Sequence, residues 1–191
     1  MIINIMPTIR NYYKNQIDLC FDKKLISLLK TNYKGATIKC VNSLNEEKFD
    51  LLVLTGGNTV IGLSNKEKDL ARSKFDNFYY KKAIQKQTPI IGICHGAQFI
   101  AKKFKGVIKK NKKVGMEKII FFNNKVKKIK LYHDYSIKKI SKDFEILAKT
   151  CDGYIESFSH KKKNICGIMW HPERNQTLNF IDKIVLKSLC S

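Results

Sequence analysis

The segment PIIGICHGAQ, residues 89–98, decides the fold of this chain. Ile90 to Ile93 is a short and continuous apolar run, which is typical of a strand buried on both faces of a parallel sheet. The stretch from Gly96 to Phe104 is predicted to be a helix. A buried strand that passes directly into a helix is a building unit of α/β proteins, so we expect this segment at the centre of a parallel sheet.

Cys94 lies between two glycines, at positions 92 and 96, in the turn between this strand and this helix. The pattern G-x-C-x-G is the thiol form of the nucleophile elbow, a tight turn in which the glycines let neighbouring backbone pass without a Cβ clash. The sulfur would be exposed at the carboxyl end of the sheet and at the positive end of a helix, where the thiolate is favoured. We therefore predict that Cys94 is a nucleophile; a buried cysteine in an ordinary turn is the alternative.

The strand LLVL, residues 51–54, runs into Thr55-Gly56-Gly57 and would expose backbone N–H groups at the same edge of the sheet. The N–H of Gly57 and the N–H of His95 could together bind the oxyanion of a tetrahedral intermediate. One such donor is worth roughly 10²-fold or more in rate. A strand followed by two glycines is common, so this signal counts only beside the others.

The segment MWHPER, residues 169–174, supplies a candidate base. His171 follows a predicted strand, Pro172 fixes the turn, and Glu173 comes two positions after the histidine. At this spacing a carboxylate can orient the imidazole that takes the proton from the thiol. We predict His171 and Glu173 as the partners of Cys94.

The rest of the chain predicts further strands and helices around this centre. Before residue 89 we expect strands at 2–6, 37–41 and 51–55 and helices at 19–29 and 66–87. The second helix is expected to bury one face with Ala71, Phe75, Phe78 and Lys82. After residue 104 we expect strands at 117–122, 126–132, 144–149, 154–158 and 165–170 and a helix at 177–189.

This order of elements predicts the fold class. Strands alternate with helices in the first half, several strands follow in the second, and no internal repeat or Gly/Ser/Pro-rich linker divides the chain. We therefore predict one α/β domain over residues 1–191, with a central, mostly parallel sheet flanked by helices and an antiparallel addition.

Composition sets the class of protein and its surroundings. Hydrophobic residues make up 43% of the chain, which is enough for a core. No apolar stretch reaches the roughly 18 residues of a transmembrane helix. The six cysteines form no CxxC pair, so we expect neither a disulfide framework nor a zinc site, and we predict a cytoplasmic location. No metal-ligand spacing and no phosphate-binding loop occurs, so we predict no metal and no cofactor.

The formal net charge of +21 makes nucleic acid an obvious candidate partner. The lysines, however, are spread along the whole chain in short groups, and no aromatic and basic signature of an RNA-recognition strand accompanies them. We favour solvated basic faces over a nucleic-acid surface, and no membrane partner is expected. The charge would still attract small anionic substrates such as phosphates or nucleotides.

The strand with Gly-Gly, the G-x-C-x-G elbow and the late His-Pro-Glu together resemble the class I glutamine amidotransferase superfamily, where these pieces occur in this order on a flavodoxin-like architecture. The resemblance spans at least residues 51–174. Three segments are more similar to its γ-glutamyl hydrolase branch (peptidase C26), which includes the γ-glutamyl-γ-aminobutyrate hydrolases. They are TGGN at 55–58, LYHDYSI at 131–137 and CDGYIESFSH at 151–160.

The resemblance implies a role for each matching residue. Cys94, His171 and Glu173 would be the catalytic triad, and Gly57 and His95 would supply the oxyanion N–H groups. Gln98, Tyr132 and His133 would hold the glutamyl α-amino and α-carboxylate groups, with Asn58 of the Gly-Gly-Asn loop beside them.

Arg10 is a separate prediction, made from its place near the first strand. It could reach the mouth of the site and clamp a carboxylate or phosphate, or lie on the surface.

The chain departs from this branch in two places. Leu131-Tyr132 stands where the branch more often carries a serine, and Lys105-Gly106 stands for the usual Gly-Gly after the elbow helix. The string ICHGAQ also resembles the elbow of the PfpI family, in which the histidine after the cysteine is itself catalytic. That family lacks the late His-Pro-Glu, so MWHPER favours the amidotransferase superfamily.

The leading hypothesis is a stand-alone hydrolase that attacks a γ-glutamyl amide through Cys94, forms a glutamyl thioester and releases glutamate. The basic charge suggests a phosphorylated or nucleotide-linked leaving amine, such as one made for surface polysaccharide decoration. A glutaminase subunit that passes ammonia to a separate synthetase uses the same residues and is the main alternative. A nucleic-acid-binding protein and a PfpI-like activity are the others.

Overall fold

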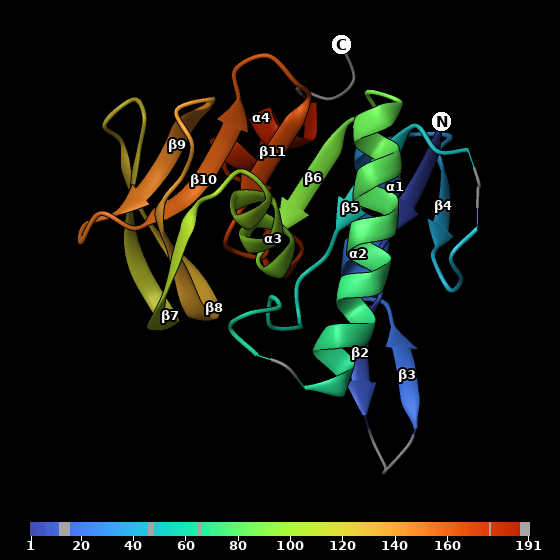
Figure 1. Cartoon of the computed structure of the whole chain (residues 1–191). Coiled ribbons are helices and arrows are strands. Elements are labelled where there is room, and N and C mark those ends of the chain that lie inside the picture. The colour runs from blue at the N-terminus through green and yellow to red at the C-terminus, as the bar shows by residue number, and fades with distance from the viewer. Residues whose placement is uncertain (12–15, 46–47, 65, 176, 188–191) are drawn as a thin grey trace.

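The buried run Ile90–Ile93 forms strand β6 within a nine-stranded sheet that has helices on both faces (Figure 1). The computed structural model describes residues 1–11, 16–45, 48–64, 66–175 and 177–187. Within these residues the strand order is β4-β1-β5-β6-β11-β10-β8-β7-β9, and β2 pairs with β3 in a separate small sheet.

The bounds of the elements are as follows. The strands are β1 (Ile2–Ile5), β2 (Thr8–Asn11), β3 (Ile17–Cys20), β4 (Thr37–Cys40), β5 (Leu51–Leu54), β6 (Ile90–Ile93), β7 (Val107–Phe121), β8 (Val126–Lys139), β9 (Phe144–Thr150), β10 (Ile155–His160) and β11 (Ile165–Ile168). The helices are α1 (Lys23–Asn32), α2 (Glu67–Gln85), α3 (His95–Lys103) and α4 (Phe180–Lys187), with a 3₁₀ turn η1 (Pro172–Arg174).

The large sheet has a parallel half and an antiparallel half. Strand β1 pairs in parallel with β4 and β5, and β6 pairs in parallel with β5 and β11. In the other half of the sheet, the described pairings among β11, β10, β8, β7 and β9 are all antiparallel. The α/β class is confirmed, but the prediction of a mostly parallel sheet is wrong for the sheet as a whole, because β7 and β8, with 15 and 14 residues, alone hold more residues than the five four-residue strands β4, β1, β5, β6 and β11.

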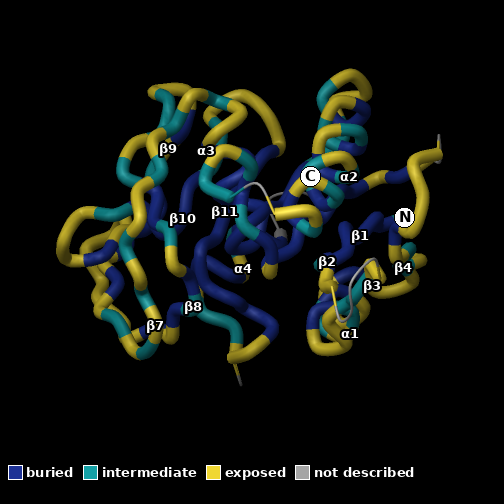
Figure 2. Tube along the Cα trace, turned by 60° about the horizontal axis from the view of Figure 1, so that its bottom comes forward, coloured by how far each residue is buried: buried dark blue, intermediate teal, exposed yellow. Residues whose placement is uncertain are grey.

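Two apolar cores lie on opposite faces of the parallel half, as side-chain alternation along a strand requires. In β5, Leu51 and Val53 join the core with α1 and α4, whereas Leu52 and Leu54 join the core with α2 and α3. Figure 2 shows the buried strands as a dark band between these helix pairs. Each fully buried Leu or Ile contributes about 1.5–3 kcal/mol, so this central part of the sheet is the rigid base of the site.

Helix α1 begins four residues later than the predicted helix at 19–29. The Asp22 side chain accepts hydrogen bonds from the backbone N–H groups of Lys24 and Leu25, which fixes the N-terminus of the helix at Lys23. Residues 17–20 instead form β3, which pairs with β2. Asp22 was the available sequence signal for this boundary.

Helix α2 buries a different face from the predicted one. Its buried residues are Asp69, Arg72, Asp76, Tyr79, Lys82 and Ala83, whereas Ala71, Phe75 and Phe78 are only partly buried. The prediction followed the apolar residues, but the inward face carries charged side chains that pair with one another and with backbone. Of the four predicted positions, only Lys82 belongs to the buried face.

The later strands occur where they are predicted, with different bounds. Strand β7 begins at Val107, ten residues before the predicted start, because its lysine-rich first half pairs with β8. Strand β8 continues to Lys139. Helix α4 begins at Phe180 rather than at residue 177, and residues 188–189 of the predicted helix lie outside the described part of the chain.

The two glycines of the G-x-C-x-G pattern are required by backbone contacts. A Cβ on Gly96 would lie 2.0 Å from the carbonyl oxygen of Leu54, and a Cβ on Gly92 would lie 2.6 Å from the backbone of Gly96. Helix α3 can therefore begin against the end of β5 only if position 96 has no side chain. This confirms the predicted reason for these glycines.

We predict that Gly96→Ala destabilises the protein, because its methyl group would push α3 away from β5. The free energy of unfolding should fall by roughly 1–3 kcal/mol or more. Urea denaturation followed by circular dichroism measures this, with Ser27→Ala on the exposed side of α1 as the control. Equal unfolding midpoints for Gly96→Ala and the wild type would contradict the prediction.

Candidate active site

Cys94 occupies the strained turn between β6 and α3. Its backbone angles are φ 51° and ψ −102°, and a non-glycine residue at positive φ costs about 1–3 kcal/mol. The turn is fixed on both sides, because the N–H of Cys94 donates to the carbonyl of Ile168 at 2.7 Å and its own carbonyl accepts from Gln98 at 3.0 Å. The conformation matches the strained nucleophile elbow expected from the sequence.

His171 and Glu173 meet Cys94 at the carboxyl ends of the parallel strands. His171 Nδ1 lies 2.6 Å from Glu173 Oε1, and both side chains are buried. A Cβ added to Gly56 would lie 3.2 Å from His171 Nε2 and 3.3 Å from Cys94 Cβ, so the imidazole and the cysteine flank the same glycine. The structure thus brings together the three residues that the sequence predicts as a triad.

The environment of His171 favours its protonated form. Burial acts to lower its pKa, but the hydrogen bonds and charges of Cys94 and Glu173 outweigh burial and raise the pKa to about 9. With Nδ1 facing a carboxylate, Nε2 is the nitrogen left to exchange a proton with the thiol. An imidazolium beside a cysteine is the charge arrangement in which the sulfur reacts as a thiolate.

A pocket of about 370 Å³ opens over Cys94, a volume within the range of small-molecule sites. It is lined by almost all of the predicted site residues, namely Arg10, Gly57, Asn58, Cys94, Gln98, Tyr132, His133, His171 and Glu173. His95 is the exception, because its buried side chain points to Asp76 and to the backbone carbonyl of Asn58, each 2.8 Å away. Its ring nitrogens are therefore committed elsewhere, unlike the catalytic histidine expected of a PfpI-like site.

The side chain of Asn58 anchors its loop instead of facing a substrate. Its Oδ1 accepts from the N–H of Ile9 at 2.8 Å, and its Nδ2 donates to the Ile9 carbonyl at 3.0 Å and to Asp69 at 3.3 Å. These bonds join the Gly-Gly loop to β2. They argue against the predicted substrate contact by this side chain.

Gln98 and His133 form part of the pocket wall. Gln98 Nε2 donates to the Tyr135 carbonyl at 2.7 Å, which fixes the amide in the wall. His133 is buried, with Nε2 3.5 Å from Glu156 Oε2 and Nδ1 3.4 Å from Ser136 Oγ. Both residues lie where the predicted contact with a glutamyl group requires them, and that contact stays a prediction.

Two basic side chains lie over the ring of Tyr132, which lines the pocket. The Arg174 guanidinium lies 4.8 Å and the Lys130 ammonium 5.4 Å from the centre of its ring, within cation–π range. Arg174 also lines the pocket, as does Arg10 from β2. Sequence reasoning missed Arg174, although it is the last residue of the MWHPER segment and its place beside Glu173 was the available signal.

Thr8 is another pocket residue absent from the sequence prediction, and no local sequence signal marked it. Its hydroxyl donates to the carbonyl of Gly56 at 2.8 Å, and its side chain lies against Gly57. Thr8 therefore helps to orient the Gly-Gly loop from β2.

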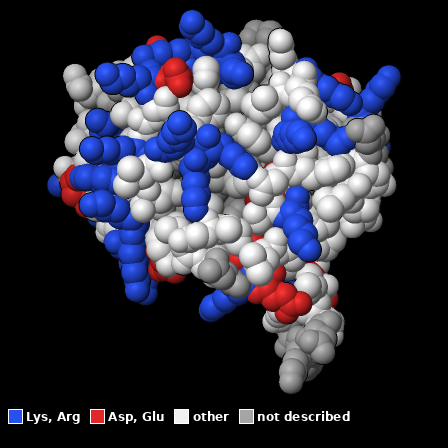
Figure 3. Space-filling view, viewed as in Figure 1, with Lys and Arg blue, Asp and Glu red and all other residues white. Residues whose placement is uncertain are grey.

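The charged side chains of the described surface are mostly basic. Figure 3 shows Lys and Arg side chains spread over one face of the molecule with few acidic side chains among them. No group of three or more His, Cys, Asp or Glu that could hold a metal ion occurs among the described residues. In the same part of the chain, none of the helices combines the length and apolar character needed to cross a membrane.

Comparison with known proteins places the chain in a family. The sequence profile of the family "Glutamine amidotransferase class-I" matches residues 21–184. The chain belongs to this family, as its motifs predicted.

Among curated relatives, γ-glutamyl-CDP-amidate hydrolase of Campylobacter jejuni is 33% identical over 131 residues, which cover 68% of this chain and 65% of that enzyme, just under two thirds of its length. A subunit of the glutamine-hydrolysing GMP synthase of Methanobrevibacter smithii is 33% identical over 153 residues, covering 71% of this chain and 73% of that protein.

Solved structures show the same fold. A Thermoplasma acidophilum protein provisionally identified as a GMP synthase subunit superimposes with a TM-score of 0.73 at 20% identity, covering 100% of this chain and 94% of the other. A glutamine amidotransferase from Thermotoga maritima gives a TM-score of 0.64 at 15% identity, covering 90% of this chain and 75% of the other.

We predict that the His171 imidazole titrates near pH 9 in the wild type and at lower pH in Cys94→Ala, which removes one source of the raised pKa. Because the folded-state pKa exceeds the usual value of about 6.5, protonation of His171 stabilises the fold fully below pH 6.5, and this contribution is lost as pH rises through about 9. NMR titration of the histidine ring measures the pKa of His171 in the wild type and in Cys94→Ala. Cys151→Ala, at an exposed cysteine, is the control; a wild-type midpoint near 6.5 would refute the prediction.

Proposed function

We propose that this protein is a cysteine hydrolase that cleaves a γ-glutamyl amide bond and releases glutamate. The observation that carries the proposal is that Cys94, His171 and Glu173 line one pocket at the ends of three parallel strands. In this pocket His171 Nδ1 lies 2.6 Å from Glu173 Oε1. Membership of the class-I amidotransferase family supports the same reaction.

The proposed reaction has two steps. The Cys94 thiolate attacks the γ-carbonyl carbon, and the N–H groups of Gly57 and His95 would receive the oxyanion. His171 donates its Nε2 proton to the amine nitrogen as the C–N bond breaks, which leaves a glutamyl thioester. Neutral His171 then takes a proton from water, the hydroxyl adds to the thioester carbon, and the C–S bond breaks to give glutamate and free Cys94.

The pocket mouth supports an anionic leaving group. Arg10 and Arg174 line it, and Lys130 lies over the same Tyr132 ring as Arg174. Guanidinium groups bind phosphate oxygens through charge-assisted hydrogen bonds. The relative from Campylobacter jejuni is named for a γ-glutamyl-CDP-amidate, which carries such phosphates. We therefore propose a phosphorylated or nucleotide-linked amine as the leaving group, with surface polysaccharide decoration as one use for that amine.

We predict that the purified protein releases glutamate from at least one member of a panel of γ-glutamyl amides, and that Cys94→Ala abolishes the release. Mass spectrometry of acid-quenched wild-type protein should detect a glutamyl adduct on Cys94 during turnover. Cys40→Ala, at an exposed cysteine, is expected to keep full activity. Folded wild-type protein that releases no glutamate from any amide of the panel would rule out the proposed activity.

We predict that Arg174→Gln lowers kcat/KM about tenfold or more for the γ-glutamyl amide of a phosphorylated amino alcohol, because a charge-assisted hydrogen bond is lost. The unphosphorylated amide should change about twofold at most. The measurement is the ratio of kcat/KM for the phosphorylated amide to kcat/KM for the unphosphorylated amide. Arg174 Nε lies 4.0 Å from Glu173 Oε1, so the substitution can affect catalysis on both substrates, and the ratio cancels that general effect. Lys118→Gln, at an exposed lysine of β7, is the control, and an unchanged ratio in Arg174→Gln would reject the anionic leaving group.

A glutaminase subunit is the second candidate. Its support is the similarity to the Methanobrevibacter smithii protein, which is named as one subunit of a glutamine-hydrolysing GMP synthase. The same residues would act on glutamine, with ammonia as the leaving group. A kcat/KM for glutamine at least 100-fold below that of the best γ-glutamyl amide would favour the hydrolase, and the reverse order would favour the glutaminase.

A further inference from the structure

Arg72 is a fully buried arginine whose donors are directed at the backbone around the Gly-Gly loop. Its Nη1 donates to the Pro7 carbonyl at 2.5 Å and contacts the Gly56 carbonyl at 3.4 Å, and its Nη2 donates to the Thr55 carbonyl at 2.9 Å. Its Nε donates to Asp76, one turn later on α2, at 2.8 Å. One side chain therefore holds three carbonyls next to the pocket.

These contacts determine where the Gly57 N–H points. In a trans peptide the C=O and the following N–H point in opposite directions. The Gly56 carbonyl is turned toward Arg72 and also accepts from Thr8 Oγ at 2.8 Å. The N–H of Gly57 is consequently directed away from Arg72 and from the Thr8 hydroxyl, and Gly57 itself lines the pocket.

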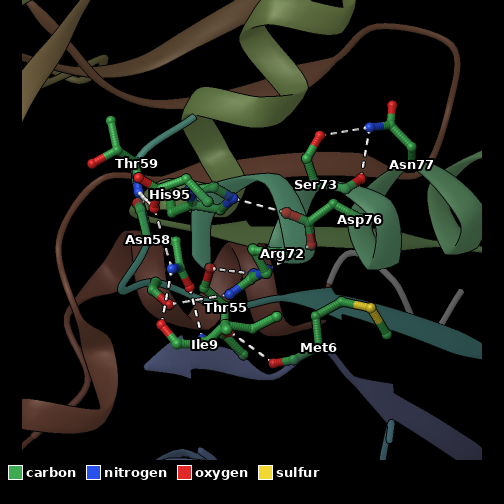
Figure 4. A network of polar contacts seen from close by, with 12 residues as sticks. Met6, Ile9, Thr55, Asn58, Thr59, Arg72, Ser73, Asp76, Asn77 and His95 are labelled. Atoms are coloured by element: carbon green, nitrogen blue, oxygen red, sulfur yellow. Dashed lines mark hydrogen bonds and ion pairs between the residues drawn. The ribbon is translucent and has the colours of Figure 1, made fainter. Parts of the chain in front are cut away.

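Asp76 continues the network to His95, the residue after the nucleophile (Figure 4). His95 Nε2 lies 2.8 Å from Asp76 Oδ2, and its Nδ1 lies 2.8 Å from the Asn58 carbonyl. A carbonyl and an ionised carboxylate can only accept hydrogen bonds, so both contacts are hydrogen bonds only when both ring nitrogens of His95 carry a proton.

The ionised state of Asp76 agrees with this geometry. Burial acts to raise the pKa of Asp76, but the charges and hydrogen bonds of Arg72 and His95 outweigh burial and hold the pKa below its usual range. Arg72 and Asp76 have no solvent exposure and His95 has 3%. With both ring nitrogens of His95 protonated, the network contains two positive groups and one negative group, which leaves one positive charge uncompensated within it.

Both ends of the network reach a backbone N–H that would bind the oxyanion. Arg72 fixes the peptide that carries the Gly57 N–H, and Asp76 fixes the side chain of the residue that carries the other N–H. His95 is the first residue of α3, whose first N–H groups have no partner within the helix. Its ring also holds the Asn58 carbonyl, which ties the start of α3 to the Gly-Gly loop.

We propose that Arg72, Asp76 and His95 are positioning residues that set the spacing of the Gly57 and His95 N–H groups and place one buried positive charge beneath the oxyanion. The catalytic part of this inference rests on the proposed hydrolysis at Cys94. The network acts through backbone and charge, so it should affect the transition state more than substrate binding.

Steady-state kinetics on the best γ-glutamyl amide test the proposal. Arg72→Met should lower kcat about 10²-fold with KM changed less than threefold, and Arg72→Lys, which keeps the charge but not the forked geometry, should fall between Arg72→Met and the wild type. Lys74→Met, on the exposed side of the same helix, is the matched control and should keep wild-type kinetics. Unchanged kcat in folded Arg72→Met, or an effect confined to KM, would overturn the proposal.

Alkylation of Cys94 by iodoacetamide gives a readout that needs no substrate. His95→Gln removes one positive charge and keeps a hydrogen-bonding side chain, so the pH of half-maximal alkylation should rise relative to the wild type. If Arg72→Met fails to fold, Arg72→Lys and His95→Gln decide the question, and wild-type kcat and alkylation profiles in both would overturn the proposal.

The two readouts also separate this proposal from the proposed function. Absence of glutamate release by the wild type would count against γ-glutamyl hydrolysis alone, since the alkylation profile would still test the charge of the network. Active wild type with unaffected variants would count against the network alone.

Discussion

The turn at Cys94 is possible only because three pieces of backbone approach one another without intervening side chains. Gly96 passes against the carbonyl of Leu54, and Gly92 passes against Gly96. The Cys94 N–H is bound to Ile168 on the other side. Strands β5, β6 and β11 thus hold a conformation that is unfavourable in isolation. Because the same three strands carry the Gly-Gly loop, Cys94 and His171 at their carboxyl ends, the constraint that strains the turn also assembles the pocket.

Much of the candidate site could be predicted from the sequence because its signals are local. The glycines around Cys94, the Gly-Gly after β5 and the spacing of His171 and Glu173 each encode backbone geometry within a few residues. Chain order alone then predicts that they meet, since the carboxyl ends of parallel strands share one edge of a sheet. The environment of each side chain was less accessible. Asn58 turned out to bind the backbone of β2, a contact across 49 positions.

The fold was predictable where burial is apolar and misread where burial is polar. The segments that form β5 and β6 are short, continuous apolar runs, which are typical of strands buried on both faces of a parallel sheet. The inward face of α2 carries Arg72 and Asp76, which sequence patterns assign to the surface, so the predicted face was displaced to Phe75 and Phe78. The prediction made β7 too short for a different reason: its lysine-rich first half is not buried, so an apolar run did not mark it.

The buried charges of α2 and α3 also constrain how this protein can diverge. Removing Asp76 alone would leave Arg72 and His95 buried without the carboxylate that pairs with both of them, at a cost of about 3–5 kcal/mol. Descendants of this chain are therefore expected to keep Asp76 wherever they keep Arg72, whereas His95 can change while the Arg72–Asp76 pair stays intact. Lys74, two positions from Arg72 on the exposed side, is free of that coupling and can drift independently.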